Sequence, residues 1–346
     1  MSQHDATTDR APGRAPAAPA KGGSAPSLEP SPALDLGVQL GGLRLKNPVL
    51  TASGTCGYGE VYGDLIDYNR LGGLMLKGTY LEPKLGNPPP RIVETPAGML
   101  NSIGLQGVGV EAFLRDKLPA LRRLDTAIIL NINGSTVDEF AELAARLNGV
   151  AGLHALEVNI SCPNVKVGGM EFGVDPRAAR EVTEAVCRAS ELPVIVKLTP
   201  NVTDITVIAR AVEDGGAAAL SVINTLRAMS IDVRTRRPKL ASITGGLSGP
   251  AIRPVAVRMV WETARAVRIP IIGMGGITTA EDALEFLIAG AGAVAVGTAS
   301  FHNPSAPLAV LDGIEAYLRE QGMTRLRDIV GSLETALYRS TKMEEK

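Results

Sequence analysis

Eight short runs rich in Val, Ile and Leu recur along the chain, separated by amphipathic stretches, and this alternation constrains the fold more than any other feature. Repeated strand and helix units of this kind predict a parallel sheet covered by helices. Eight such strands in a chain of 346 residues favour one (β/α)8 TIM barrel of the α/β class over two smaller domains. The predicted strands occupy residues 48–53, 73–78, 127–133, 155–160, 194–198, 219–224, 270–274 and 293–297.

Two of the intervening helices carry start signals. Thr136 stands three residues before Glu139, and Thr278 stands three before Glu281. At this spacing the threonine can cap exposed N–H groups while the glutamate bonds back. Apolar residues then recur at helical spacing, so each helix is expected to pack outside a strand; they are Val137, Phe140, Ala141, Ala144 and Leu147 in the first helix, and Ala283, Leu284, Leu287 and Ile288 in the second.

The charge balance and the cysteines limit the class of protein. Lys plus Arg number 35 and Asp plus Glu number 36, so the protein has no large net charge that would attract nucleic acid or an anionic membrane. Hydrophobic residues make up 45% of the chain and aromatics 3%, which predicts an aliphatic core. Cys56, Cys162 and Cys187 lack metal-ligand spacing and cannot all pair within one chain. A reducing cytoplasm is expected, with neither metal nor iron–sulfur cluster in this chain.

The two ends of the chain differ from its middle. Residues 1–33 are rich in Ala, Pro, Gly and Ser, and they contain no apolar run long enough for a signal peptide or a membrane span. We expect a disordered tail there, and the acidic residues within it argue against the alternative of a transit peptide. The predicted barrel domain covers 34–331, followed by a C-terminal tail at 332–346. Two long connections, 81–108 and 226–249, are expected to cover the active face of the barrel.

Polar residues collect where the predicted strands end. A lone Asn at such a place usually caps a turn and a lone Lys is usually solvated, but six strands share the feature. Lys77 and Lys197 moreover lie within apolar runs, where an ammonium needs an anionic partner or a lowered pKa. A functional site is therefore expected at this end of the barrel. Its candidates are Ser53, Lys77, Asn131, Asn133, Asn159, Cys162, Lys197, Thr199, Asn224 and Thr225.

The chemistry of this site is indicated by a cysteine and by glycines. Cys162 follows the fourth strand between Asn159 and Asn164 and can act as a base, whereas Cys56 and Cys187 have no obvious acid–base neighbour. Glycines follow the seventh and eighth strands, where barrels frequently bind phosphate through backbone N–H groups. A G-x-G-x-x-A match at 107–112 follows a loop and not a strand, so direct nicotinamide binding is not expected.

Five separated segments resemble class 1B dihydroorotate dehydrogenase, the catalytic subunit of the NAD-linked bacterial type. They read NISCPN at 159–164, NSIGLQ at 101–106, GNPPPR at 86–91, TGGLSGP at 244–250 and GMGGI at 273–277. The resemblance, over about 35–315, implies a TIM barrel that binds FMN and oxidises dihydroorotate to orotate in pyrimidine biosynthesis. Cys162 would take the proton from C5, and FMN would take the hydride from C6.

The resemblance also implies roles for individual residues. Lys77 and Lys197 would join Cys162 in catalysis, with Lys197 beside flavin N1 and the C2 carbonyl. The flavin would be lined by Ser53, Lys77, Gly78, Asn131, Asn159, Lys197, Ile223, Gly249, Gly275, Gly276, Gly297 and Thr298. The substrate would be held by Lys77, Asn101, Ser102, Ile103, Gly104, Leu105, Asn159, Asn224 and Thr225. Amides suit a planar cyclic ureide because they offer both donors and acceptors without charge, and a lysine suits its carboxylate.

The electron acceptor follows from the same resemblance. Class 1B implies a separate subunit with FAD and a 2Fe-2S cluster that passes electrons to NAD, in a heterotetramer of two catalytic and two accessory chains. Three alternatives stay open: a class 1A-like enzyme that reduces fumarate directly, a lysine-dependent aldolase or isomerase whose glycines bind a substrate phosphate, and a non-catalytic binding module. A flavoprotein is yellow and bleaches with dihydroorotate, which distinguishes it from the last two.

Overall fold

The structure, a computed structural model, describes residues 33–161, 166–167 and 170–335. Eight parallel strands close into a barrel in the order β11-β12-β17-β18-β3-β4-β7-β8, so each strand pairs with the next barrel strand along the chain and β18 pairs with β3. All eight predicted strands are present, and the predicted TIM barrel is confirmed. Their bounds are β3 Val49–Thr51, β4 Gly73–Met75, β7 Ala127–Ile132, β8 Ala155–Asn159, β11 Val194–Leu198, β12 Ala219–Val222, β17 Ile271–Met274 and β18 Ala293–Val296.

Helices cover the outside of the barrel, which explains why its strands are apolar on both faces. Neighbouring helices pack against one another in the sequence α3 to α7 and then α9. None of the helices in the described ranges is long and apolar enough to cross a bilayer. Their bounds are α1 Val110–Ala112, α2 Leu118–Leu121, α3 Val137–Leu147, α4 Pro176–Ala189, α5 Ile205–Asp214, α6 Arg253–Ala264, α7 Ala280–Ala289, α8 Ala299–His302 and α9 Ala306–Glu320.

Four short helical segments lie in the loops between the strands and helices of the described residues. A π-helical segment, η2, joins α1 to α2 over Phe113–Lys117. The 3-10 turns are η1 Tyr68–Arg70, η3 Pro250–Ile252 and η4 Leu326–Asp328. The segment η3 leads directly into α6, so Gly249, which caps η3, stands at a helix start.

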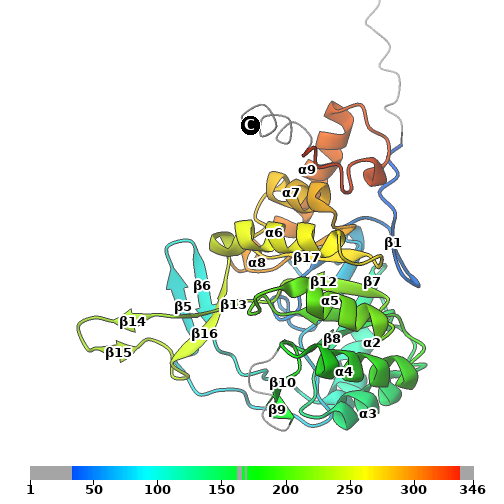
Figure 1. Ribbon diagram of the computed structural model, residues 1–346. Coiled ribbons are helices and arrows are strands. Elements are labelled where there is room, and N and C mark those ends of the chain that lie inside the picture. Colours follow the sequence, from blue (N-terminus) through cyan, green and yellow to red (C-terminus); the bar gives the residue numbers. More distant parts are fainter. Residues whose placement is uncertain (1–32, 162–165, 168–169, 336–346) are drawn as a thin grey trace, which may run out of the picture. The chain divides into compact units, whose positions relative to one another are not determined.

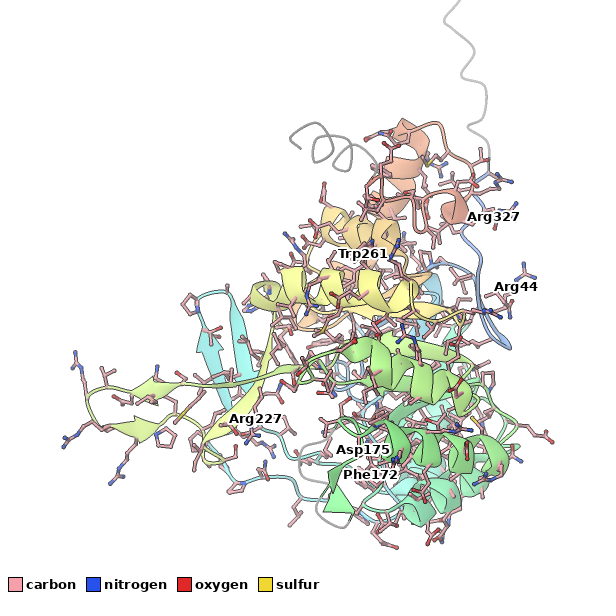
Figure 2. The ribbon with its side chains drawn as sticks, in the orientation of Figure 1. Arg44, Phe172, Asp175, Arg227, Trp261 and Arg327 are labelled. Carbon is pink, nitrogen blue, oxygen red and sulfur yellow. The ribbon has the colours of Figure 1, made fainter. Side chains whose placement is uncertain are left out.

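The helix caps confirm one predicted start signal and correct the other. The Thr136 side chain accepts a hydrogen bond from the Glu139 backbone N–H, as expected for the start of α3. In α7 the cap is Thr279 and not Thr278, and it forms a capping box with Asp282 in place of Glu281. The prediction was one residue early because two adjacent threonines are each followed by an acidic residue at the required spacing. Asp175 caps α4 by accepting hydrogen bonds from the backbone N–H groups of Arg177 and Ala178 (Figure 2).

A short antiparallel hairpin closes the end of the barrel at which the strands begin. It consists of β1 Val38–Leu40 and β2 Leu43–Leu45. The side chains of Leu40 and Leu45 are almost completely buried. Gly41, in the turn, has a φ of 57°, and a Cβ there would lie 2.7 Å from the Cβ of Ala218, just before β12. The functional site must therefore use the opposite end.

The two long connections that we expected to cover the site form one antiparallel sheet. Its order is β13-β16-β6-β5, so strands from residues 92–101 pair with strands from residues 226–248 (Figure 1). We call it the cover sheet; Arg227 lies on β13 (Figure 2). The strands are β5 Ile92–Thr95, β6 Gly98–Asn101, β13 Leu226–Met229 and β16 Thr244–Ser248, with small hairpins formed by β9 Lys166–Val167 and β10 Met170–Glu171, and by β14 Ile231–Asp232 and β15 Arg237–Pro238.

Candidate active site

The carboxyl ends of the eight barrel strands, which we call the barrel mouth, carry most of the predicted site residues. Carboxyl ends of parallel strands meet on one face of a barrel, and active sites of this fold lie there. The residues on or just after these strands are Ser53 (β3), Lys77 and Gly78 (β4), Asn131 (β7), Asn159 (β8), Lys197 (β11), Ile223, Asn224 and Thr225 (β12), Gly275 and Gly276 (β17), and Gly297 and Thr298 (β18). The others, Asn101 to Leu105 and Gly249, lie at the ends of the cover strands β6 and β16.

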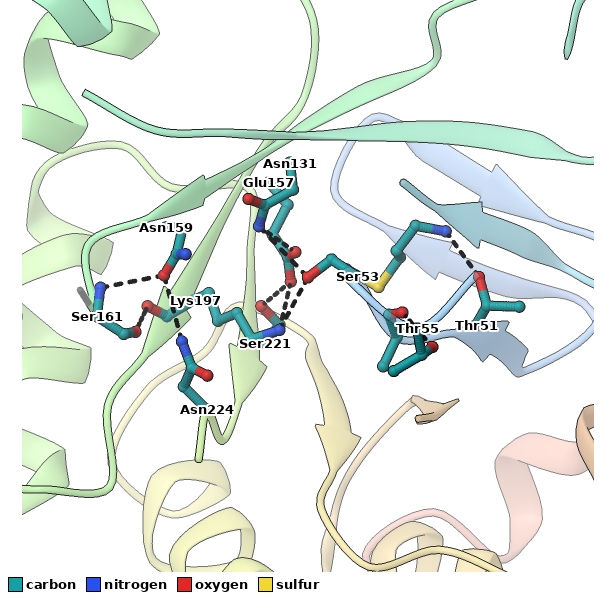
Figure 3. Close-up of polar contacts among 12 residues, drawn as sticks. Thr51, Ser53, Thr55, Asn131, Glu157, Asn159, Ser161, Lys197, Ser221 and Asn224 are labelled. Atoms are coloured by element: carbon teal, nitrogen blue, oxygen red, sulfur yellow. Dashed lines mark hydrogen bonds and ion pairs between the residues drawn. The ribbon is translucent and has the colours of Figure 1, made fainter. Parts of the chain in front are cut away.

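Lys197 is a buried cation at the centre of this arrangement. Its side chain is 6% exposed, its Nζ donates a hydrogen bond of 3.0 Å to Ser53 Oγ, and it lies 3.8 Å from Glu157 Oε1 (Figure 3). An ammonium carries three donors. Within the described ranges, Ser53 Oγ is the acceptor of its one hydrogen bond, which leaves donors for a ligand.

Glu157 is a site residue that our sequence reasoning missed. It is completely buried on β8, where its Oε1 accepts a hydrogen bond of 2.7 Å from Ser221 Oγ and its Oε2 accepts one of 2.6 Å from Asn131 Nδ2 (Figure 3). The signal that could have found it is the one that singled out Lys197, namely a charged residue inside an apolar strand. Glu157 and Lys197 thus form a polar centre within an aliphatic barrel.

Four asparagines form a continuous chain of side-chain hydrogen bonds across the mouth. Asn224 Nδ2 donates to Asn159 Oδ1 (3.3 Å), Asn159 Nδ2 to Asn133 Oδ1 (2.9 Å), and Asn133 Nδ2 to Asn131 Oδ1 (2.9 Å). We call these four residues the amide chain; it ends at Glu157 through the bond from Asn131. Asn131 and Asn133 are buried, whereas Asn159 and Asn224 are half-buried at the mouth. Asn133 was a strand-end candidate without an assigned role. Its side chain is hydrogen-bonded to two predicted site residues, Asn159 and Asn131.

Lys77 is a second cation of the mouth, and it has a different environment. Its Nζ forms neither a hydrogen bond nor an ion pair with the residues that the structure describes. Burial lowers the pKa of Lys77, and the nearby Arg91 guanidinium lowers it further. Glu60 opposes this shift only in part, and neither Lys77 nor Arg91 forms an ion pair with the described residues, so the two cations form a site suited to an anion.

The predicted substrate residues of the cover sheet and of the barrel are brought together. Gly246 on β16 pairs with Asn101 on β6, and Asn101 Nδ2 donates to the Gly246 carbonyl at 3.5 Å. A Cβ on Gly246 would lie 2.0 Å from Thr225 Oγ1, which follows β12. The close approach requires glycine at this position. Segments more than a hundred residues apart in the sequence therefore border the same space.

The loop after β6 has an unusual backbone. Gly104 and Leu105 have φ values of 73° and 55°, in the left-handed region that leucine disfavours by about 1–2 kcal/mol. The hydroxyl of Ser102 is buried without a hydrogen-bond partner among the described residues. Strained backbone and orphaned polar atoms gather at functional sites, because a ligand can satisfy what the protein leaves unpaired. Both observations fit a ligand-binding role for 101–105.

The glycines after β17 fit a bound phosphate. Gly275 and Gly276 have φ values of 126° and 84°, and within the described chain no acceptor takes a hydrogen bond from their backbone N–H groups. A Cβ on Gly276 would lie 2.8 Å from the Cβ of Arg253, at the start of α6. Free N–H groups beside a helix start attract anions. Thr298 Oγ1 donates to Ser248 Oγ at 2.8 Å, which joins the end of β18 to the cover sheet.

Two of the three cysteines, Cys56 and Cys187, lie within the described residues. Cys162 lies outside the described residues, so its predicted role as base stays a prediction. Cys56 is buried, its Sγ lies 3.4 Å from Thr51 Oγ1, and burial raises the pKa of its thiol to about 11. Burial likewise raises the pKa of Cys187 to about 11. Neither thiol is suited to act as a base near neutral pH.

Comparison with known proteins gives the family. The sequence model described as dihydroorotate dehydrogenase matches residues 35–318. The chain belongs to the dihydroorotate dehydrogenase family. It is 58% identical over 300 residues to a protein of Pelobacter propionicus, covering 87% of this chain and 99% of the relative, and 59% identical over 295 residues to one of Desulforudis audaxviator, covering 85% and 96%. Both relatives are named dihydroorotate dehydrogenase B (NAD(+)), catalytic subunit.

Membership of the dihydroorotate dehydrogenase family confirms the resemblance seen in the sequence motifs. The match covers the whole barrel, from the residues before β1 to within α9, so the mouth and the cover sheet both lie inside it. The buried carboxylate Glu157, which the sequence motifs did not predict, lies within the matched residues and ends the amide chain.

Proposed function

We propose that this chain is the catalytic subunit of an NAD-linked dihydroorotate dehydrogenase, which oxidises dihydroorotate to orotate in pyrimidine biosynthesis. The observation that carries the proposal is the combination, at one barrel mouth, of an amide chain with two lysines that have donors to spare. Amides match the alternating N–H and C=O groups of a cyclic ureide, and a lysine matches its carboxylate. Relatives 58–59% identical bear the corresponding name.

FMN, when bound, supplies the acceptor for the hydride that leaves C6 of the substrate. Free backbone N–H groups of Gly275 and Gly276 suit its phosphate, and the spare donors of Lys197 suit the flavin N1 and C2 carbonyl. A cation there stabilises negative charge on the ring. The proposed FMN residues are Ser53, Lys77, Gly78, Asn131, Asn159, Lys197, Ile223, Gly249, Gly275, Gly276, Gly297 and Thr298.

The substrate ring is held, in this proposal, by Asn159 and Asn224 of the amide chain together with Thr225 and residues 101–105. Lys77 binds the carboxylate, since its ammonium forms no ion pair within the described ranges and lies near the Arg91 guanidinium. Cys162 removes the proton from C5. A free cysteine has a pKa of roughly 8.5, so a minor fraction is thiolate at neutral pH.

The electrons leave, we propose, through an accessory subunit that carries FAD and a 2Fe-2S cluster and reduces NAD. Support comes from the words "NAD(+)" and "catalytic subunit" in the names of the relatives. We further propose two catalytic and two accessory chains in the complex, a cytoplasmic location, and a barrel domain at 34–331 between an N-terminal tail and a C-terminal one. A fumarate-reducing enzyme of class 1A type is the alternative for this step.

An anaerobic absorbance experiment tests the proposal. The purified protein is expected to be yellow and to bleach when dihydroorotate is added without oxygen, and the colour is expected to return when NAD is added together with the accessory subunit. Fumarate in place of NAD distinguishes the class 1A alternative, because it would restore the colour without that subunit. A colourless protein that stays unchanged by dihydroorotate after incubation with FMN would contradict the proposal and favour the aldolase or the binding module.

A further inference from the structure

The hydrogen bonds of the amide chain all run in the same direction. Each Nδ2 donates toward Glu157: Asn224 to Asn159, Asn159 to Asn133, Asn133 to Asn131, and Asn131 to the carboxylate. At the outer end, the Thr225 backbone N–H donates to Asn224 Oδ1 at 2.8 Å. The polarity of the chain is therefore consistent from the surface of the mouth to the centre of the barrel.

A carboxylate explains this direction because it can only accept hydrogen bonds, whereas an amide has one donor end and one acceptor end. Since Glu157 Oε2 accepts from Asn131, the Asn131 amide must turn its Nδ2 inward and its Oδ1 toward Asn133. The same constraint then passes to Asn133 and Asn159. If one amide turned over, two donors or two acceptors would face each other, and buried polar groups would lose their partners.

We propose that Glu157 is a positioning residue whose carboxylate fixes which atoms Asn159 and Asn224 present to the substrate. The proposal rests on the proposed function, in which these two asparagines hold the pyrimidine ring. Glu157 is completely buried and lies at the inner end of the amide chain, so it acts through Asn131 and Asn133. The two outer asparagines are half-buried and form the end of the chain that a ligand can reach.

The orientation of these two amides decides affinity because a cyclic ureide offers donors and acceptors at fixed places. Asn159 Oδ1 accepts from Asn224 Nδ2 and also from the Ser161 backbone N–H at 3.2 Å, which holds the oxygen on one side. With the direction reversed, Asn159 would turn a donor toward Asn224 Nδ2 and the Ser161 N–H, where its acceptor now stands. Each such mismatch leaves a buried polar group unpaired.

Two substitutions at Glu157 separate the acceptor from the carboxylate charge. Glu157→Gln keeps a carbonyl oxygen for Asn131 and can turn its own amide toward the Ser221 hydroxyl, whereas Glu157→Leu leaves Asn131 without an acceptor. Orotate binding to the FMN-loaded protein is measured by the change in the flavin spectrum. We expect Glu157→Leu to weaken binding about tenfold or more and Glu157→Gln to weaken it by no more than about threefold.

Matched variants show whether the effect passes along the chain. Ser221→Ala removes the other hydrogen bond to Glu157 and is expected to leave orotate affinity unchanged. Asn133→Leu interrupts the amide chain at a buried position and is expected to weaken orotate binding as much as Glu157→Leu does. If Glu157→Leu does not retain FMN, Asn133→Leu is used to test the proposal in its place. In a double-mutant cycle, Glu157→Leu should add little once Asn224 is replaced by Ala.

The proposal is overturned if Glu157→Leu and Asn133→Leu, each loaded with FMN, bind orotate as tightly as the parent protein. It is also overturned if Glu157→Gln weakens binding as much as Glu157→Leu, because the charge and not the acceptor would then matter. Failure of the parent protein itself to bind FMN and orotate would instead contradict the proposed function, so the two failures are distinguishable.

Discussion

The ammonium of Lys197 lies 3.0 Å from the hydroxyl of Ser53, and this hydrogen bond joins opposite walls of the barrel. Lys197 is on β11 and Ser53 follows β3, and these strands are four places apart in the ring. The cation is thereby held beneath the mouth with its charge only partly balanced by Glu157 at 3.8 Å. A buried cation with spare donors favours a ligand that gains negative charge.

Replacing Lys197 by Ala is expected to lower the midpoint potential of the bound flavin and to slow its reduction by dihydroorotate about 10- to 100-fold. The reason is the loss of one charge-assisted hydrogen bond, which contributes about 1.5–3 kcal/mol. Anaerobic redox titration and stopped-flow reduction measure the two effects. Lys197→Arg keeps the charge and serves as the control. An unchanged potential in Lys197→Ala would show that the ammonium does not act on the ring.

Lys77 gives a prediction about pH. Its pKa is lowered by burial and by Arg91, so its charge is lost at a lower pH than that of free lysine, about 10.4. Orotate affinity should therefore decline on the alkaline side, starting below that value. Calorimetric titration over a pH series measures this decline, and Lys77→Arg should shift it to higher pH. The same alkaline decline in Lys77→Gln would assign it to another group.

Gly276 gives a prediction about FMN binding. Gly276→Ala should strongly reduce the flavin content, because a Cβ would lie 2.8 Å from the Cβ of Arg253 in a backbone with a φ of 84°. Gly322→Ala is the matched control, since Gly322 has a φ of 66° with open space around it. The control should lose about 1–2 kcal/mol of stability and keep its FMN. Equal flavin content in both variants would contradict a phosphate site at Gly276.

The cysteines should differ in reactivity. Cys56 is 1% exposed, and burial raises its thiol pKa to about 11, so iodoacetamide should leave it unmodified in the folded protein near pH 8. Cys162, as the proposed base, should react first, and orotate should protect it. Peptide mass mapping after short labelling times measures the order. Labelling of Cys56 ahead of Cys162 would contradict it.

Substitution of the proposed base tests the proton transfer. Cys162→Ser should reduce flavin reduction by dihydroorotate at least about 100-fold at neutral pH, because a general base contributes about that much and a hydroxyl ionises less readily than a thiol. In the parent protein the rate should rise with pH until the thiol ionises. Cys187→Ser is the control, with unchanged rate and pH profile. Full turnover by Cys162→Ser would rule out this base.

The strands and the strand-end residues could be predicted because they depend on local patterns. Runs of Val and Ile bounded by polar residues predicted β7, β8 and β11 within a residue or two of their observed ends. Lys77 and Lys197 were recognisable since a charge in an apolar run is costly. The start of α7 was predicted one residue early, because Thr278 and Thr279 both satisfy the same spacing and the local pattern does not choose between them.

The sequence by itself therefore determined the eight-stranded barrel and which residues stand at its mouth. The spacing of apolar residues and the polar residues at strand ends are properties of residues close together in the sequence. Tertiary structure alone decided that residues 92–101 and 226–248 share one sheet, that Lys197 reaches Ser53, and that the amide chain ends on Glu157. These relationships depend on the register between strands and on closure of the ring, which place side chains from distant segments within hydrogen-bond distance. No periodicity within a single segment encodes them.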